Sequence, residues 1–197
     1  MKQAGVKIAA ITAYDYPTGL IADRSGVDVI LVGDSLANTA LGYDNTIPVT
    51  VAEMQAALRA VRRAVARALL VVDLPFGSYH KSREDTLENA ITLVKSGGEA
   101  VKLEGGARRA PLVRALVDAE IPVMGHIGLT PQSIHAMGGF KVQGKQAEHA
   151  RKLVQAAKSL AHAGCFAVVL EGVPVRVAEM VTEAIDIPTI GIGAGQH

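Results

Sequence analysis

Short apolar runs rich in Val and Ile recur along this chain, and each is followed by a longer segment of helical character. The runs are apolar at nearly every position, which is typical of strands buried on both faces of a sheet. Strands that alternate with helices predict a parallel α/β sheet with right-handed crossovers. The expected strands cover residues 8–13, 29–33, 69–74, 100–103, 122–125, 166–170 and 189–192.

Signals for the ends of helices lie between these runs. Thr50 and Glu53 have the spacing of a capping box, as do Ser82 and Asp85. Gly97, followed by a second glycine, indicates the end of a helix. An open doubly wound sheet and a closed barrel both fit this alternation, and about seven strand–helix units are one fewer than a (β/α)8 barrel has. The expected helices cover residues 50–68, 82–95, 110–119, 146–163 and 175–184.

Length and composition limit the class of protein. A chain of 197 residues, 49% of them hydrophobic, predicts a single domain over residues 1–197. The formal net charge of +1 argues against a nucleic-acid partner, and we expect the four arginines at 59, 62, 63 and 67 to form a solvated helix face. No apolar run spans a membrane and no signal peptide is recognisable, which favours a soluble cytoplasmic protein. The single cysteine, Cys165, lies in an apolar run and is expected to be buried and inert.

Ionisable side chains fall at or just after the ends of five expected strands. They are Asp34, Asp73, Glu104, His126 and Glu171. The carboxyl ends of parallel strands share one edge of the sheet, where α/β enzymes build their active sites. Carboxylates brought together repel unless a cation or a proton separates them. Their oxygens suit Mg²⁺, whereas no Cys or His pair has zinc-ligand spacing.

Each of these residues also has a plainer interpretation. Asp34 or Asp73 could cap the next helix, Glu104 could be a turn residue, and Glu171 could pair with an arginine. A structural, hydrogen-bonded role is the default for His126. Lys102 precedes Glu104 by two residues, so in a strand both side chains point to the same face. Either Lys102 forms a structural ion pair with a glutamate, or it binds a substrate carboxylate.

Several sequence blocks, in order, resemble the ketopantoate hydroxymethyltransferase family over nearly the whole chain. The blocks are TAYDY (12–16), VGDSL (32–36), GYD (42–44), PVT (48–50), DLPFGSY (73–79), VKLEGG (101–106), GHIGLTPQS (125–133), GGFKVQG (138–144), LEGVP (170–174) and GIGAG (191–195). Residues 37–40 and Gly172 depart from the family's commoner pattern without touching the expected ligands. The family continues with an eighth strand and C-terminal helices, so the resemblance implies a C-terminally truncated (β/α)8 TIM barrel.

The resemblance also implies a ligand set. Asp34 and Asp73 would coordinate Mg²⁺, with Glu104 in the same coordination shell. Ser35 and Lys102 would hold the 2-oxo acid together with the two aspartates.

The implied reaction transfers a hydroxymethyl group from 5,10-methylenetetrahydrofolate to 3-methyl-2-oxobutanoate, which gives 2-dehydropantoate in pantothenate biosynthesis. Glu171 would be the general base, acting on a magnesium-stabilised enolate, and His126 would line the site and contact substrate or product. The family is also a homodecamer, so the resemblance implies that assembly. Two alternatives stay open: another enzyme of the phosphoenolpyruvate/isocitrate lyase superfamily, whose typical Lys-Lys-Cys-Gly-His loop is missing from this sequence, or a folded binding module without activity.

Overall fold

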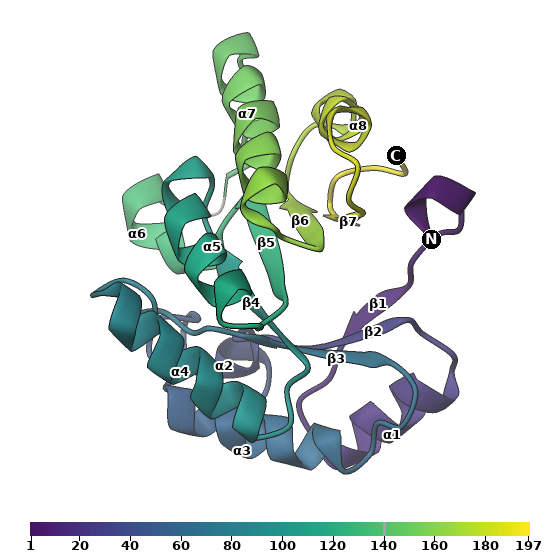
Figure 1. The fold of residues 1–197 in the computed structure, drawn as a ribbon, viewed down its shortest axis with the longest axis vertical. Coiled ribbons are helices and arrows are strands. Elements are labelled where there is room, and N and C mark those ends of the chain that lie inside the picture. The colour runs from purple at the N-terminus through teal and green to yellow at the C-terminus, as the bar shows by residue number, and fades with distance from the viewer. Residues whose placement is uncertain (140) are drawn as a thin grey trace. The chain divides into compact units, whose positions relative to one another are not determined.

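The structure, a computed structural model, describes residues 1–139 and 141–197 (Figure 1). These residues form two compact units, which are described separately. The β1–β4 unit contains Ile8–Leu103 and Asp118–Pro122. The β5–β7 unit contains Met1–Lys7, Glu104–Val117 and Val123–His197. That residues 1–197 act as one catalytic domain stays a prediction.

All paired strands of the β1–β4 unit are parallel, and their order follows the sequence. Val and Leu side chains fill the strand interiors, and most of them are fully buried, which explains the unbroken apolar runs. The first strand is shorter than its apolar run. The strands are β1 (Ala10–Thr12), β2 (Val29–Val32), β3 (Leu69–Asp73) and β4 (Ala100–Glu104).

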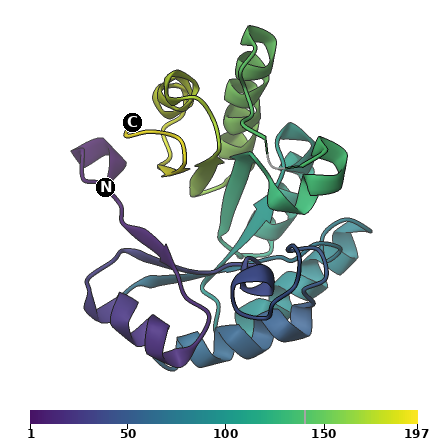
Figure 2. The same cartoon turned by 180° about the vertical axis from the view of Figure 1, so that it is seen from behind.

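Helices of this unit follow the strands as the alternation predicts. Figure 1 shows α1, α3 and α4 lying along one face of β1–β3, and α3 packs against both α1 and α4. Figure 2 shows the connection after β2, which contains the short α2, from the other side. The helices are α1 (Tyr16–Arg24), α2 (Leu36–Thr39), α3 (Val51–Arg62) and α4 (Arg83–Lys95).

The two expected helix starts are confirmed. Thr50 and Glu53 form a reciprocal capping box, and Ser82 accepts a hydrogen bond from the Asp85 amide. The expected extension of α3 to residue 68 is wrong. The carboxylate of Asp23, in α1, accepts hydrogen bonds from the amides of residues 66, 67 and 68 at 2.8–3.1 Å, which holds this segment in a non-helical path.

The β5–β7 unit has the same strand–helix alternation. Its strands are parallel and lie in the order β5-β6-β7. They are β5 (Val123–Gly128), β6 (Ala167–Glu171) and β7 (Thr189–Ile192). The strand β5 ends three residues later than expected, so His126 lies inside it. The α-helices are α5 (Ala110–Asp118), α6 (Ile134–Met137), α7 (Ala147–Ala163) and α8 (Val175–Ala184), and the 3-10 turns are η1 (Lys2–Ala4), η2 (Ala107–Arg109) and η3 (Pro131–Ser133).

The N-terminal turn is fastened to the C-terminal end of α8. The Lys2 ammonium donates to the carbonyl oxygens of Thr182, Ile185 and Ile187 at 2.6, 2.6 and 3.0 Å. A helix leaves its last carbonyl groups without helical partners, so a cation placed there satisfies them and complements the helix dipole. Burial lowers the pKa of Lys2, while the nearby Asp186 raises it.

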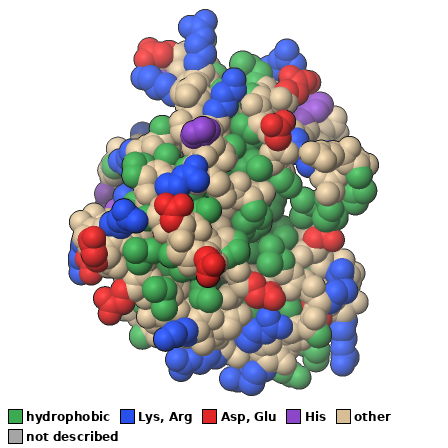
Figure 3. Space-filling model, viewed as in Figure 1, with side chains coloured by type: hydrophobic (Ala, Val, Ile, Leu, Met, Phe, Trp, Pro, Cys, Tyr) green, Lys and Arg blue, Asp and Glu red, His purple; other side chains and the backbone are tan. Residues whose placement is uncertain are grey.

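The expectation that four arginines form one solvated helix face is confirmed only in part, because Arg62 is half-buried beside Glu99 and Arg67 lies beyond the end of α3. Arg59, Arg63 and Arg67 are exposed, and Figure 3 shows Lys and Arg side chains gathered over the α1 and α3 region, at the bottom of the view. Cys165 is buried, as expected. Among the helices in residues 1–139 and 141–197, none has the length and apolar character needed to cross a membrane.

Candidate active site

Asp73 and Lys102 form a buried ion pair in the β1–β4 unit. They are register partners on β3 and β4, and Lys102 Nζ lies 2.6 Å from Asp73 Oδ1. The second oxygen of Asp73, Oδ2, accepts a hydrogen bond from the Asp34 amide at 2.9 Å. The side chains of all three residues are buried to about 95% or more. The strand register therefore explains why these predicted residues meet.

Ser35 completes this cluster on the side of β2. Its hydroxyl lies 2.8 Å from the Tyr14 hydroxyl. Gly33 makes room for the cluster, because a Cβ atom there would lie 3.0 Å from Ser35 Oγ and 3.5 Å from Asp73 Oδ2. Tyr14 was not singled out from the sequence, although it lies in the first of the family-like blocks.

The donor set of this cluster suits a hard cation. Among the described residues, no group of three or more His, Cys, Asp or Glu side chains is arranged to hold a metal ion. Mg²⁺ does not need such a group, because it is commonly held by one or two carboxylates together with waters and substrate oxygens. A carboxylate offers about four lone-pair sites, so Asp73 keeps acceptor capacity beside its contacts to Lys102 and Asp34. Asp34 and Asp73 thus fit the role of Mg²⁺ ligands.

His126 lies between two glutamates in the β5–β7 unit. Its Nδ1 is 3.4 Å from Glu104 Oε1, and its Nε2 is 3.2 Å from Glu171 Oε2. Glu104 Oε2 accepts a hydrogen bond from the Gln132 amide at 3.0 Å. A protonated imidazole presents an N–H group on each ring nitrogen, so in that form His126 can orient both carboxylates, whereas a neutral ring can donate to only one of them. Gln132 therefore belongs to the same cluster as Glu104, His126 and Glu171, although in the sequence it stands out only as part of the GHIGLTPQS block.

The strand register aims Glu171 toward His126. Gly128 is the register partner of Glu171 and lies two residues after His126, so the two side chains lie on the same face of the sheet. Gly128 has a φ of +95°, and a Cβ atom there would lie 2.2 Å from the Glu171 carbonyl oxygen. The Glu171 side chain is 22% exposed, whereas those of Glu104 and His126 are 3% exposed. Of these three groups, Glu171 is the one that can reach a bound molecule.

The plainer interpretations can now be compared with the structure. Neither aspartate caps a helix, because the N-caps of α2 and α4 are Ser35 and Ser82. Glu104 lies in β4 and is buried, so it is not a turn residue. Glu171 is paired with His126 and Lys102 with Asp73, where an arginine and a glutamate were the plain alternatives. Phe140, in the GGFKVQG block, lies outside the described residues.

Parallel strands that alternate with helices and carry buried ionisable groups near their carboxyl ends are the features of α/β-barrel enzymes. Comparison with solved structures supports this class. The chain is similar to 2,3-dimethylmalate lyase, a member of the PEP mutase/isocitrate lyase superfamily, with a TM-score of 0.73 at 17% identity over all of this chain and 72% of that one. It is also similar to phosphonopyruvate hydrolase, solved with oxalate and Mg²⁺, with a TM-score of 0.65 at 13% identity over 98% and 78%. The fold is therefore of the TIM-barrel class, with seven strands in the described residues.

The particular family follows from the sequence comparison. The family model for ketopantoate hydroxymethyltransferase matches residues 1–197. The 3-methyl-2-oxobutanoate hydroxymethyltransferase of Geobacter metallireducens is 57% identical over all of this chain and 74% of its own length. That of Carboxydothermus hydrogenoformans is 58% identical over 99% of this chain and 71% of its own length. This chain belongs to the ketopantoate hydroxymethyltransferase family, which is a family of transferases.

Proposed function

We propose that this chain transfers a hydroxymethyl group from 5,10-methylenetetrahydrofolate to 3-methyl-2-oxobutanoate, which gives 2-dehydropantoate. Family membership supports the reaction class. The observation that carries the mechanism is the position of Glu171, whose partly exposed carboxylate lies 3.2 Å from Nε2 of the buried His126. A carboxylate in that position can take a proton from a bound substrate and remain oriented while it does so.

Glu171 is the proposed general base. It takes the proton from C3 of the 2-oxo acid, and the electrons of that C–H bond form the enolate. The C3 carbon then attacks the methylene carbon as one of its two C–N bonds to the folate breaks. Water displaces the second folate nitrogen and supplies the hydroxyl of the product. The proton from C3 and one proton from water end on the two nitrogens, so tetrahydrofolate leaves. His126 is a positioning residue in this scheme, because it contacts the carboxylates of Glu171 and Glu104. General base catalysis of this kind typically contributes about 10²–10⁴ in rate.

In the β1–β4 unit we assign the 2-oxo acid to Asp34, Ser35, Asp73 and Lys102. Mg²⁺ held by Asp34 and Asp73 would withdraw electrons from the keto group and favour loss of the C3 proton. The ammonium of Lys102 supplies a buried positive charge that an organic carboxylate requires if it is to leave water. Ser35 offers a hydroxyl that can donate a hydrogen bond. A metal-ligand role for Glu104, in the other unit, stays a prediction.

The folate donor, the homodecamer and the cytoplasmic location are proposed on the family resemblance. Phosphonopyruvate hydrolase, which shares the fold, was solved with Mg²⁺ and oxalate, a small dicarboxylate, and this lends support to the magnesium proposal.

Exchange of the C3 proton tests the proposed function without any folate. The chain is incubated in D2O with 3-methyl-2-oxobutanoate and Mg²⁺, and loss of the C3 proton signal is followed by NMR. We expect exchange with the unsubstituted chain, and a loss of about 100-fold or more in Glu171→Gln, because an amide cannot accept the proton. Chelation of Mg²⁺ with EDTA should also abolish exchange.

The control is Glu179→Gln, which changes a partly exposed glutamate of α8 that pairs with Arg176. It should exchange at the unsubstituted rate. Equal exchange in Glu171→Gln and Glu179→Gln would sink the assignment of the base. No exchange from a folded, unsubstituted chain would reject the enolising reaction for this chain.

A further inference from the structure

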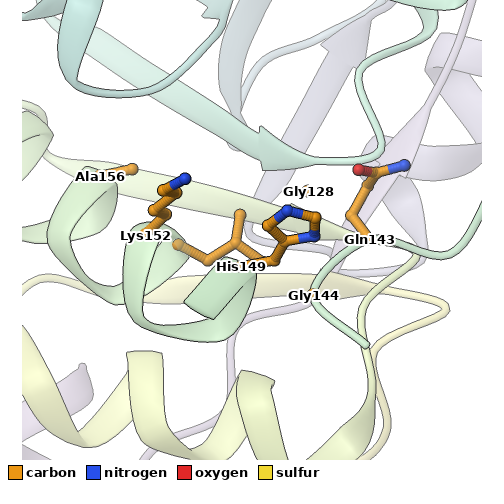
Figure 4. Close-up of a pocket in the computed structure, with 7 residues that line it drawn as sticks. Gly128, Gln143, Gly144, His149, Lys152 and Ala156 are labelled. Carbon is orange, nitrogen blue, oxygen red and sulfur yellow. The ribbon is translucent and has the colours of Figure 1, made fainter. Parts of the chain in front are cut away.

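A pocket of about 300 Å³ lies in the β5–β7 unit, apart from the residues assigned above. Figure 4 shows the side chains of His149 and Lys152 projecting from α7, with Gln143 beyond His149. Leu153 and Ala156 give the pocket an apolar wall. Among the described residues, the lining consists of Gly128, Gln143, Gly144, His149, Lys152, Leu153 and Ala156.

This pocket borders the two backbone segments that hold Glu171. Gly128, in its lining, is the register partner of Glu171. The backbone N–H of Gln143, also in the lining, donates a hydrogen bond to the carbonyl oxygen of Gly172 at 2.8 Å. The pocket therefore adjoins the backbone at the end of β6, and a long ligand with one end in the pocket can extend from there toward the side chain of the proposed base.

The polar groups of the pocket favour an anion. Lys152 supplies a positive charge, and the His149 ring and the side-chain amide of Gln143 can donate hydrogen bonds. The pocket also lies along the first turns of the 17-residue helix α7, whose N-cap residue Gln146 makes no side-chain capping hydrogen bond among the described residues. The first amides of a helix and its dipole attract negative charge.

Among the described residues, the acidic group that pairs with Lys152 is Glu148. Its Oε1 lies 2.6 Å from Lys152 Nζ, and the two side chains are 73% and 68% exposed. Exposed ion pairs of this kind contribute roughly 0–1 kcal/mol. A ligand carboxylate can therefore replace Glu148 as the partner of Lys152.

We infer that this pocket binds the glutamate carboxylates of the tetrahydrofolate co-substrate, with Lys152 as the principal cation. The inference rests on the proposed function, because the reaction brings the pterin end of the folate to the substrate carbon near Glu171. The carboxylates lie at the opposite end of the folate, beyond an aromatic ring that Leu153 and Ala156 can contact. A volume of about 300 Å³ is at the low end of ligand pockets, so it suits this end of the molecule and not the whole.

Two ligands that differ only in the glutamate test the inference. Tetrahydrofolate and tetrahydropteroate share the pterin and the aminobenzoate, but tetrahydropteroate lacks the glutamate. Their dissociation constants are measured by isothermal titration calorimetry with the full chain. Lys152→Ala should weaken tetrahydrofolate binding by roughly three- to tenfold and leave tetrahydropteroate binding unchanged. Glu148→Gln should tighten tetrahydrofolate binding by about two- to threefold, because it releases Lys152 and removes a like charge.

The matched control is Lys158→Ala, which removes an exposed lysine of the same helix outside the pocket. It should change neither dissociation constant. The inference is overturned if Lys152→Ala affects both ligands equally or neither, or if the unsubstituted chain binds neither. C3 proton exchange, measured without folate on the same sample, reports separately on the proposed function. Exchange without glutamate-dependent binding rejects only the pocket assignment, and glutamate-dependent binding without exchange rejects only the reaction.

Discussion

Lys102 is a buried cation that pairs with the carboxylate of Asp73 on the neighbouring strand. Removal of one member of a buried ion pair leaves the other charge without compensation, which typically destabilises a protein by about 3–5 kcal/mol. We expect Lys102→Met to lower the free energy of unfolding by that amount, measured by urea denaturation. Lys158→Met, at an exposed position, should change it by no more than about 0.5 kcal/mol.

A double variant separates charge from packing. If the loss comes from the orphaned charge, then Lys102→Met combined with Asp73→Asn should be less destabilising than the sum of the two single changes. Additive losses would show that the pair is not coupled.

Cys165 gives a second prediction about a single side chain. Burial raises the pKa of its thiol to about 12, so the reactive thiolate is nearly absent at neutral pH. We expect the folded chain to react with DTNB far more slowly at about pH 8 than the chain unfolded in urea, where the ordinary thiol pKa of about 8.5 returns. Rapid labelling of the folded chain would show that this segment opens to solvent.

At this scale the sequence located the site residues better than their partners. Asp34, Asp73 and Lys102 are brought together, as are Glu104, His126 and Glu171. The contact between Lys102 and Asp73 depends on the register of β3 against β4, which no local pattern reveals. The spacing of Lys102 and Glu104 along one strand drew attention to the wrong partner for the same reason.

Elements with strong local signals were predicted well, and elements limited by tertiary contacts were not. The bounds of α8 and β7 match the expected ranges, and α7 differs by one residue. The capping box of α3 is formed by residues three positions apart in the sequence. The C-terminal end of α3 depends instead on Asp23, about 40 residues earlier. The arginine and alanine residues that follow have high helix propensity, so the sequence alone did not indicate where α3 ends.

The Asp23 contact predicts a pH-dependent contribution to stability. Hydrogen bonds from the amides of residues 66–68 hold the pKa of Asp23 below its usual value. A depressed pKa in the folded state stabilises the fold above the unfolded pKa, and this contribution disappears as the pH falls through the folded pKa. We expect Asp23→Asn to lower the free energy of unfolding by about 1 kcal/mol at pH ~7 and to have little effect at pH ~2.

Asp44→Asn, at an exposed position, serves as the control and should have little effect at either pH. A loss in Asp23→Asn that is equal at both pH values would mean that the charge of Asp23 is not responsible.

Gly128 couples two strands by close approach. A side chain there would collide with the Glu171 carbonyl oxygen, so the ends of β5 and β6 would have to separate. We expect Gly128→Ala to destabilise the chain by more than about 3 kcal/mol, measured by thermal and urea unfolding. Gly5→Ala also has a positive φ but no atom within 4 Å, so it should lose only about 1 kcal/mol. Equal losses would attribute the effect to backbone strain alone.

At the scale of the whole molecule, the two outer strands differ from the inner ones. Inner strands are almost fully buried, whereas β1 and β7 expose Ile11 and Ile192 by 48% and 46%. Outer strands with apolar side chains favour association with other chains. We expect concentration-dependent association in sedimentation velocity experiments, reduced by Ile192→Lys. Ile21→Lys, on the exposed side of α1, is the control, and an equal reduction there would exclude the strand as the cause.

The fastening of Lys2 to the end of α8 has a consequence for the order of events during synthesis. Lys2 is synthesised about 180 residues before its acceptors at 182–187. At translation rates of about 5–20 residues per second, Lys2 waits roughly 10–40 s for these partners. The β5–β7 unit therefore completes its fold only after residue 187 has been made, about 65 residues after Pro122, the last residue of the β1–β4 unit.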